Sequence, residues 1–286
     1  MPVSGGVQVA LDTWDGAGVG FLLVHGLASN ARMWDGVAGR LAELGHAVAA
    51  VDQRGHGRSD KPEVGYDFTT VCDDLEAVLG ALRAGLGGSG EGWSRPVVVG
   101  QSWGANVALE LGFRAPDLLR GVGCVDGGTI ELAGRFATWE DCAAVMAPPS
   151  LVGTPAGRFE AAVRAAHPSW PGSGIQGTLA NFEVRPDGTV APWLSFEHHM
   201  QILAALYEHR PSTRYAGLSV PVLFMPADDG GSAWTADKRA AVDAALAAVP
   251  VARAVWFSPA DHDVHAQFPD ELAKVLAGAV ADGFFA

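Results

Sequence analysis

The sequence is poor in the residues on which several protein classes depend. Its three cysteines, Cys72, Cys124 and Cys142, show neither a metal-ligand spacing nor a disulfide framework. Lys and Arg number 19 against 32 Asp and Glu, so the formal net charge is −13. A chain this acidic is a poor partner for nucleic acid or for an anionic membrane surface. We therefore expect reduced, buried thiols and no nucleic-acid partner.

Long apolar runs are also absent, and no signal peptide is expected. No uninterrupted apolar run approaches the roughly 18 residues that a membrane span requires. Residues 1–10 have neither a basic segment nor an apolar one of the kind that begins a signal peptide. These absences predict a cytoplasmic protein that does not associate with membranes.

Apolar residues, in contrast, are abundant and regularly spaced. They make up 49% of the 286 residues, which is enough for a sizeable core and fits one α/β domain with or without an insertion. Short apolar runs alternate with segments whose apolar residues recur at helical spacing, as Trp34, Val37, Leu41 and Leu44 do. This alternation predicts a parallel sheet with its active site at the carboxyl ends of the strands. The expected strands are 7–11, 20–24, 47–51, 96–99, 121–125, 220–225 and 251–257.

The alternation lapses between residues 127 and 216. This stretch has several prolines, weakly amphipathic pieces and the large aromatics Trp139, Trp170 and Trp193. We expect a mainly helical cap at 127–216, inserted into a core formed by 1–126 and 217–286. The three tryptophans are candidate substrate-binding residues, although large aromatics can equally fill the cap's own small core.

One motif has a chemical meaning that depends on its position. Residues 100–104 read Gly-Gln-Ser-Trp-Gly, between a predicted strand and a predicted helix. In that context Gly-x-Ser-x-Gly is a nucleophile elbow, a turn so tight that the serine backbone is strained and the flanking residues have no room for side chains. The motif predicts that the Ser102 hydroxyl stands at the top of the sheet.

With these features the chain resembles the α/β-hydrolase superfamily, and within it the cap-bearing esterase, lactonase and C–C hydrolase group. The resemblance covers nearly the whole chain outside the cap, and it implies a mostly parallel eight-stranded sheet flanked by helices. It is specific for the fold but not for the substrate. The matching features are, in order, His25–Gly26, the loop from Asp52 to Ser59 with Arg54, Gly55 and Gly57, the elbow, and Asp261–His262 ahead of Phe268–Pro269.

The resemblance implies a Ser-His-Asp triad. Ser102 is the expected nucleophile, and because a serine hydroxyl needs a neighbouring base, His262 is the expected partner, with His265 as its rival. The acid has two candidates that the sequence does not separate. Asp229 follows the strand after which the family usually places the acid, and Asp126 follows the preceding strand, as in a second family arrangement.

The same resemblance implies an oxyanion hole made by the backbone N–H groups of Leu27 and Trp103. No metal or cofactor is expected. Residues 197–199 read Glu-His-His, but adjacent helical side chains point apart. Residues 85–90 match the dinucleotide fingerprint, but they follow a helix and not a strand, which favours a plain loop.

The leading hypothesis is a serine hydrolase that cleaves an ester, lactone or thioester of a small apolar substrate through an acyl-enzyme on Ser102. C–C bond hydrolysis or cofactor-free perhydrolysis on the same triad is an alternative. A ligand receptor that retains the triad without turnover is another, because fold alone does not fix function. We expect a monomer or homodimer.

Overall fold

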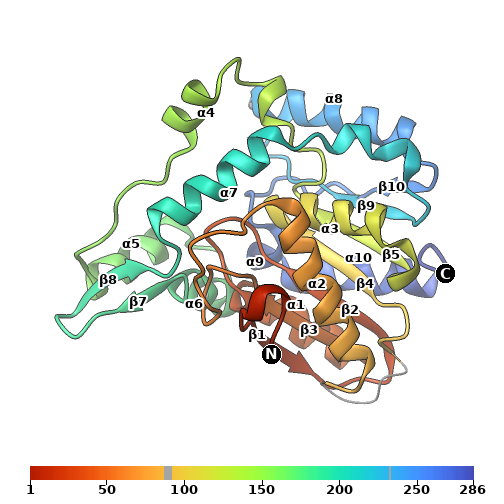
Figure 1. Ribbon diagram of the computed structural model, residues 1–286, viewed down its shortest axis with the longest axis horizontal. Helices are drawn as coiled ribbons and strands as arrows, with labels where there is room; N and C mark the ends of the chain where they lie inside the picture. The colour runs from red at the N-terminus through yellow and green to blue at the C-terminus, as the bar shows by residue number, and fades with distance from the viewer. Residues whose placement is uncertain (87–91, 232) are drawn as a thin grey trace.

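The computed structural model describes residues 1–86, 92–231 and 233–286, without side chains at 233 and 234. Its centre is a seven-stranded sheet in the order β1-β3-β2-β4-β5-β9-β10 (Figure 1). β1 runs antiparallel to β3 and the other neighbours are parallel, which confirms the predicted α/β-hydrolase fold. The strands are β1 (Ala10–Trp14), β2 (Gly18–Val24), β3 (His46–Asp52), β4 (Val97–Gln101), β5 (Gly121–Val125), β9 (Val222–Met225) and β10 (Ala252–Ala254).

The prediction of eight strands was wrong by one. In the described chain the segment before β1 does not add a strand; it folds back on itself and leaves a single antiparallel bridge between Pro2 and Gln8. Proline has no N–H to donate to a ladder. Gly5 and Gly6 take positive φ in a one-turn 3-10 helix, η1 (Ser4–Gly6), which interrupts extended backbone.

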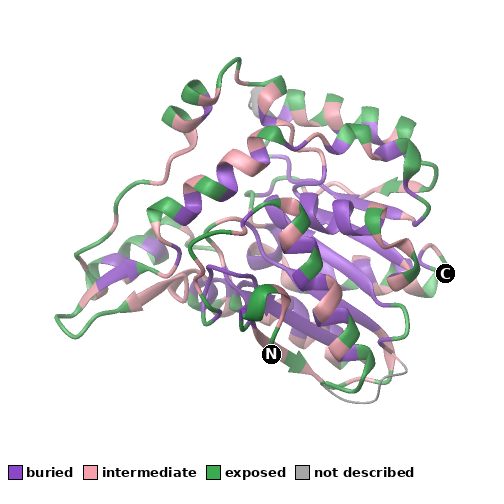
Figure 2. Cartoon of the chain, viewed as in Figure 1, coloured by how far each residue is buried: buried purple, intermediate pink, exposed green. Residues whose placement is uncertain are grey.

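Helices cover both faces of the sheet, which explains why its central strands are continuous apolar runs (Figure 2). On one face, α2 (Phe68–Arg83) and α3 (Trp103–Arg114) pack against alternate strand residues such as Leu22 and Val98. On the other, α1 (Asp35–Glu43) and α10 (Pro269–Ala281) pack against Phe21 and Leu23. Figure 1 shows α2 and α3 in front of the sheet and α10 behind it.

Residues 127–216, which we call the cap segment, lie beyond one end of the sheet, at the left and top of Figure 1. The segment was expected to be mainly helical, and it also contains a three-stranded antiparallel sheet in the order β6-β8-β7. Its helices are α4 (Trp139–Met146), α5 (Ala156–Ala166), α6 (Gly172–Leu179) and α7 (Phe196–Glu208), and its strands are β6 (Thr154–Pro155), β7 (Phe182–Val184) and β8 (Thr189–Pro192).

The rest of the chain returns to the core through α8 (Ala233–Ala248) and α9 (Val264–Gln267). Of the loop that matches the dinucleotide fingerprint, residues 87–90 lie outside the described part of the chain. No helix among the described residues combines the length and apolar character that crossing a bilayer demands.

Close backbone packing makes glycine obligatory at the turn between β4 and α3. A Cβ at Gly100 would collide with the backbone of Gly104, and a Cβ at Gly104 would collide with the carbonyl oxygens of Val24 and His25. Neither obstacle is a movable side-chain tip. Gly80, on the exposed surface of α2, has no atom within 4 Å of the position of a Cβ.

We expect Gly104→Ala to lower the free energy of unfolding by about 3 kcal/mol or more, because the methyl group forces the elbow away from β2. The matched control, Gly80→Ala, should raise it by up to about 1 kcal/mol, because alanine favours a helix interior. Urea denaturation of both variants measures the difference. Equal stability of the two variants would contradict the packing argument.

Candidate active site

Ser102 occupies the strained turn that the motif predicts. It connects β4 to α3 with φ 53° and ψ −122°, and its N–H donates to the carbonyl of Val125 at 2.9 Å. That hydrogen bond links the turn to the end of the neighbouring strand β5. The serine is therefore placed beside the residue that follows β5, which is Asp126.

Backbone strain is concentrated at this edge of the sheet. Among the described residues, the non-glycine residues with positive φ are Ala28 at 57°, Ser102 at 53° and Asp126 at 41°. They follow the carboxyl ends of β2, β4 and β5, which are adjacent strands. Each such conformation costs of order 1–3 kcal/mol and persists only when the surrounding structure enforces it. Such strain clusters at functional sites, so these three positions identify a candidate site.

The Asp126 carboxylate is the most heavily bonded group at the site. Its Oδ2 accepts from His262 Nδ1 at 2.6 Å, and its Oδ1 accepts from the N–H of Ala227 at 2.9 Å. Lys238 Nζ lies 2.6 Å from Oδ1 and 2.9 Å from Oδ2. The side chain of Asp126 is only 3% exposed. A buried carboxylate needs this many donors to remain charged.

The two partners shift each other's titration. Burial raises the pKa of Asp126, but the hydrogen bond and charge of His262, with the charge of Lys238, outweigh it and hold that pKa below its usual value. Partial burial lowers the pKa of His262, but the hydrogen bond to Asp126 and the nearby charges of Asp263 and Asp126 raise it above its usual value. The arrangement therefore favours an Asp carboxylate beside a His that can carry a proton.

The side chain of His262 is accessible, and the backbone of its loop contacts the elbow. Its side chain is 55% exposed, and its backbone carbonyl accepts from Gln101 Nε2 at 3.3 Å, so the residue before Ser102 contacts it directly. A hydrogen bond between Ser102 Oγ and the His262 ring is not among those that the described residues make. Such bonds are often long in free enzymes and tighten when substrate binds.

Asp229, the other candidate acid, bonds a different part of the chain. It is exposed, and its Oδ1 accepts from Thr235 Oγ1 at 2.7 Å and from the N–H of Gly231 at 3.3 Å. These bonds belong to the turn that leads into α8. Of the two aspartates that the sequence left open, the structure places Asp126 against the histidine.

The backbone amides expected to form the oxyanion hole are available. In the part of the chain that the structure describes, the N–H groups of Leu27 and Trp103 donate no hydrogen bond. His25 fixes the loop that carries Leu27, because its Nδ1 bonds the carbonyl of Gly26 at 2.7 Å and its Nε2 accepts from the N–H of Gln53 at 3.0 Å. Burial lowers the pKa of His25, so it braces the loop as a neutral ring.

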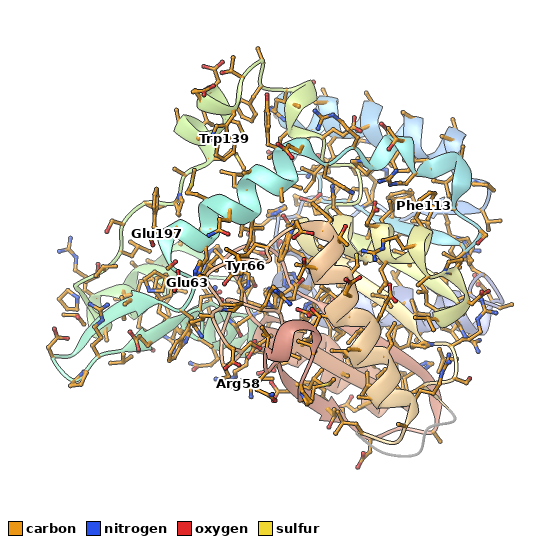
Figure 3. All side chains as sticks on the ribbon, viewed as in Figure 1. Arg58, Glu63, Tyr66, Phe113, Trp139 and Glu197 are labelled. Carbon is orange, nitrogen blue, oxygen red and sulfur yellow. The ribbon has the colours of Figure 1, made fainter. Side chains whose placement is uncertain are left out.

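The three tryptophans proposed to bind substrate have different surroundings. Trp170 is buried in the cap segment, and its indole donates to Asp261, the neighbour of His262, at 3.1 Å. Trp193 lies under the ammonium group of Lys61, 5.2 Å from the ring centroid. Trp139 packs against Tyr207 and lies on α4, well away from the sheet (Figure 3). Trp170 therefore contacts the histidine loop, whereas the ring contacts described for Trp139 and Trp193 are with Tyr207 and Lys61.

The cap sequence Glu197-His198-His199 does not converge on one point. Glu197 is exposed at the start of α7 (Figure 3), whereas both histidines are buried. His198 stacks on Tyr66 at 4.8 Å, and burial lowers the pKa of His199 to about 4. In the described chain no three His, Cys, Asp or Glu side chains are grouped so that they could hold a metal ion.

His265, the rival base, is fully buried behind the site. Its ring packs on Trp34 at a centroid distance of 4.5 Å, and neither ring nitrogen has a hydrogen-bond partner among the described residues. Burial lowers its pKa to about 4. The ring stays neutral near pH 7 and has no route to a substrate.

Two residues at the site were missed by the sequence analysis. Gln101 lies inside the elbow motif, whose pattern leaves that position unspecified. Lys238 stands in the first half of α8, 112 residues after the carboxylate that it bonds. Nothing in the local sequence connects that lysine to Asp126, because the contact exists only once α8 packs beside β10 at the edge of the sheet.

Comparison with known proteins gives the family. The model of the Alpha/beta hydrolase family matches residues 21–275. The chain is 35% identical over 111 residues to a 2-(acetamidomethylene)succinate hydrolase of Mesorhizobium japonicum, which is 39% of this chain and 36% of that protein. It is 34% identical over 116 residues to epoxide hydrolase B of Mycobacterium tuberculosis, 40% of this chain and 29% of that one. The matches span about a third of these relatives' length.

Solved structures extend the likeness to the whole fold. The crystal structure of E-2-(acetamidomethylene)succinate hydrolase superposes with a TM-score of 0.74 at 23% identity, covering 97% of this chain and 96% of that one. A thioesterase domain from the curacin biosynthetic pathway gives the same TM-score at 19% identity, with 96% of both chains covered. At these identities the likeness shows the fold alone.

The buried His265 predicts acid-sensitive stability. As pH falls below 6.5 the unfolded chain binds a proton at this residue, whereas the folded chain binds it only near pH 4, so stability is lost through that window. One group shifted this far contributes a loss of about 3 kcal/mol. We expect His265→Phe to retain stability at pH 7 and to flatten the fall between pH 6.5 and 4, as urea unfolding at several pH values would measure. Identical pH slopes for variant and wild type would contradict this assignment.

Proposed function

We propose that this chain, which belongs to the alpha/beta hydrolase family, is a serine hydrolase that cleaves an ester, lactone or thioester through an acyl-enzyme on Ser102. The observation that carries the proposal is the 2.6 Å contact between His262 Nδ1 and the buried Asp126, on the loop that Gln101 joins to the elbow. A carboxylate on one ring nitrogen leaves the other free to take a proton from a nucleophile.

The reaction follows from these roles. His262, neutral before attack, takes the proton of Ser102 as Oγ adds to the substrate carbonyl, and Asp126 stabilises the imidazolium that forms. The imidazolium then returns the proton to the leaving group. Water, activated by the same ring, hydrolyses the acyl-enzyme and restores the serine.

The negative charge that develops on the carbonyl oxygen needs donors that are already in place. The N–H groups of Leu27 and Trp103 are suited to this task. They follow the carboxyl ends of β2 and β4, and among the described residues neither has to break another hydrogen bond first. The loss of one such donor costs about 3–4 kcal/mol of transition-state stabilisation in other hydrolases. Their availability supports hydrolysis more than it supports a receptor.

The substrate proposed for this site is a small molecule with an apolar part. The support is the set of large aromatic side chains in the cap segment, among which Trp170 contacts the loop of His262 through Asp261. Aromatic side chains bury apolar ligand surface effectively. Trp139 and Trp193 stay candidate substrate contacts on the same chemical ground.

A second candidate substrate class comes from the comparisons. A 2-(acetamidomethylene)succinate hydrolase is similar to this chain both in sequence and in fold. Cleavage of the acetamidomethylene compound would use the same serine, histidine and oxyanion groups. Epoxide hydrolase B is also similar to this chain in sequence, but the serine at the elbow of this chain argues against epoxide hydrolysis. C–C bond hydrolysis and perhydrolysis remain alternatives on the same triad.

A fluorophosphonate probe tests the nucleophile. We expect it to label the wild-type protein at Ser102, because attack on phosphorus uses the same activated hydroxyl. Ser102→Ala should abolish labelling while retaining the fold, and mass spectrometry of the labelled peptide identifies the site. A folded wild-type protein that resists the probe would favour the receptor alternative.

Two matched substitutions test the acid. Asp126→Asn should reduce the rate of probe labelling or ester hydrolysis at pH 7 by about 10³-fold or more, because the amide cannot stabilise the imidazolium. Asp229→Asn removes a carboxylate from the other candidate position and should leave the rate within about twofold, as an exposed residue far from the chemistry does. The reverse order of effects would assign the acid to Asp229.

A further inference from the structure

Lys238 contacts the carboxylate of the proposed catalytic triad. Its ammonium group, on α8, lies within hydrogen-bond distance of both oxygens of Asp126, at 2.6 and 2.9 Å, and also donates to the carbonyl of Ala227 at 2.8 Å. The side chain is 27% exposed, so only part of its charge is screened by solvent. The carboxylate that would serve the histidine is thus shared with a lysine side chain.

This sharing has two physical consequences. The bonds from Lys238 and from the N–H of Ala227 hold the carboxylate in one rotamer, with Oδ2 facing the ring of His262. The positive charge also opposes the formation of a second positive charge on that ring. A carboxylate with a fixed counter-ion can orient the base without fully stabilising its protonated form.

The charges around His262 explain why such a balance is useful. Asp126 after β5 and Asp263 in the histidine's own loop both favour the imidazolium, and Lys238 on α8 opposes it. The buried His265 on α9 stays neutral near pH 7. With two carboxylates and no cation, the ring would be protonated over more of the neutral pH range. A protonated ring cannot act as a base.

We propose that Lys238 is a positioning residue that fixes the Asp126 carboxylate and limits how strongly that carboxylate favours the protonated form of His262, so that more of the ring can act as a base near neutral pH. The inference rests on the serine-hydrolase function proposed above, but its effect on the histidine does not require turnover. Among the described residues Lys238 bonds Asp126 and the carbonyl of Ala227 but not the ring of His262, so it acts through Asp126.

The test compares three substitutions at this position. Lys238→Met removes charge and donor, Lys238→Gln keeps a donor without the charge, and Lys238→Arg keeps both. The pH dependence of fluorophosphonate labelling gives the midpoint at which His262 loses its proton. NMR titration of the His262 ring, assigned with a His262→Asn variant, measures the same midpoint without any reaction.

We expect the Met and Gln variants to raise the midpoint by about half a unit to one unit, because an opposing charge is lost. Their labelling rate should then fall several-fold at pH 6 and recover at pH 9. Lys238→Arg should stay near the wild-type midpoint. The control Arg239→Met removes the same charge from the next residue of α8, whose partner is Asp228, and should leave the midpoint unchanged.

An unchanged or lowered midpoint in both the Met and Gln variants would overturn the proposal. A labelling rate reduced equally at all pH values would likewise overturn it, because that result indicates a merely structural lysine. If Lys238→Met does not fold, the midpoint of Lys238→Gln is compared with that of the wild type instead. If the wild-type protein is not labelled at all, the proposed function fails, and the NMR midpoints still decide the role of Lys238.

Discussion

The buried carboxylate of Asp126 is the group on which the rest of the site depends. It bonds the loop of His262, the N–H of Ala227 beyond β9 and the ammonium group of Lys238 on α8, so one side chain joins three segments that are far apart in sequence. A charge this buried is stable only while its donors stay in place, and removing one leaves an uncompensated ion that costs several kcal/mol. The position of the histidine and the packing of α8 are therefore parts of one electrostatic arrangement.

The fold supplies that arrangement at a defined place. The central strands are apolar on both faces and buried, so their order fixes which carboxyl ends are neighbours. The residues that follow β2, β4 and β5 then have little room, and positive φ at Ala28, Ser102 and Asp126 is the result. Burial of the sheet compensates the cost of this strain. The strained residues Ser102 and Asp126 therefore lie at the edge of the sheet that the His262 loop contacts.

Whether the sequence could predict a feature depends on how far apart along the chain its interacting residues lie. The elbow was predictable because its glycines and serine are adjacent, and so was the alternation that defines the fold. Asp126 and Asp229 were not separable, since each follows a strand, and the choice depends on which strand end faces the histidine loop. The short strands β7 and β8 and the contact of Lys238 were missed because three- or four-residue strands carry little periodicity and helix packing leaves no local pattern.

The histidines show how one residue type is sorted into different roles by its surroundings. Burial lowers the pKa of five histidines: His25, His46, His56, His199 and His265. At His262 the Asp126 hydrogen bond and two carboxylate charges outweigh burial, so its pKa moves in the opposite direction. The buried rings are kept neutral and serve the loops and the core, while the accessible ring can exchange a proton near neutral pH. A base influenced by two carboxylates is useful only if it is not protonated at too high a pH, and the cation on the far side of Asp126 opposes that protonation together with burial.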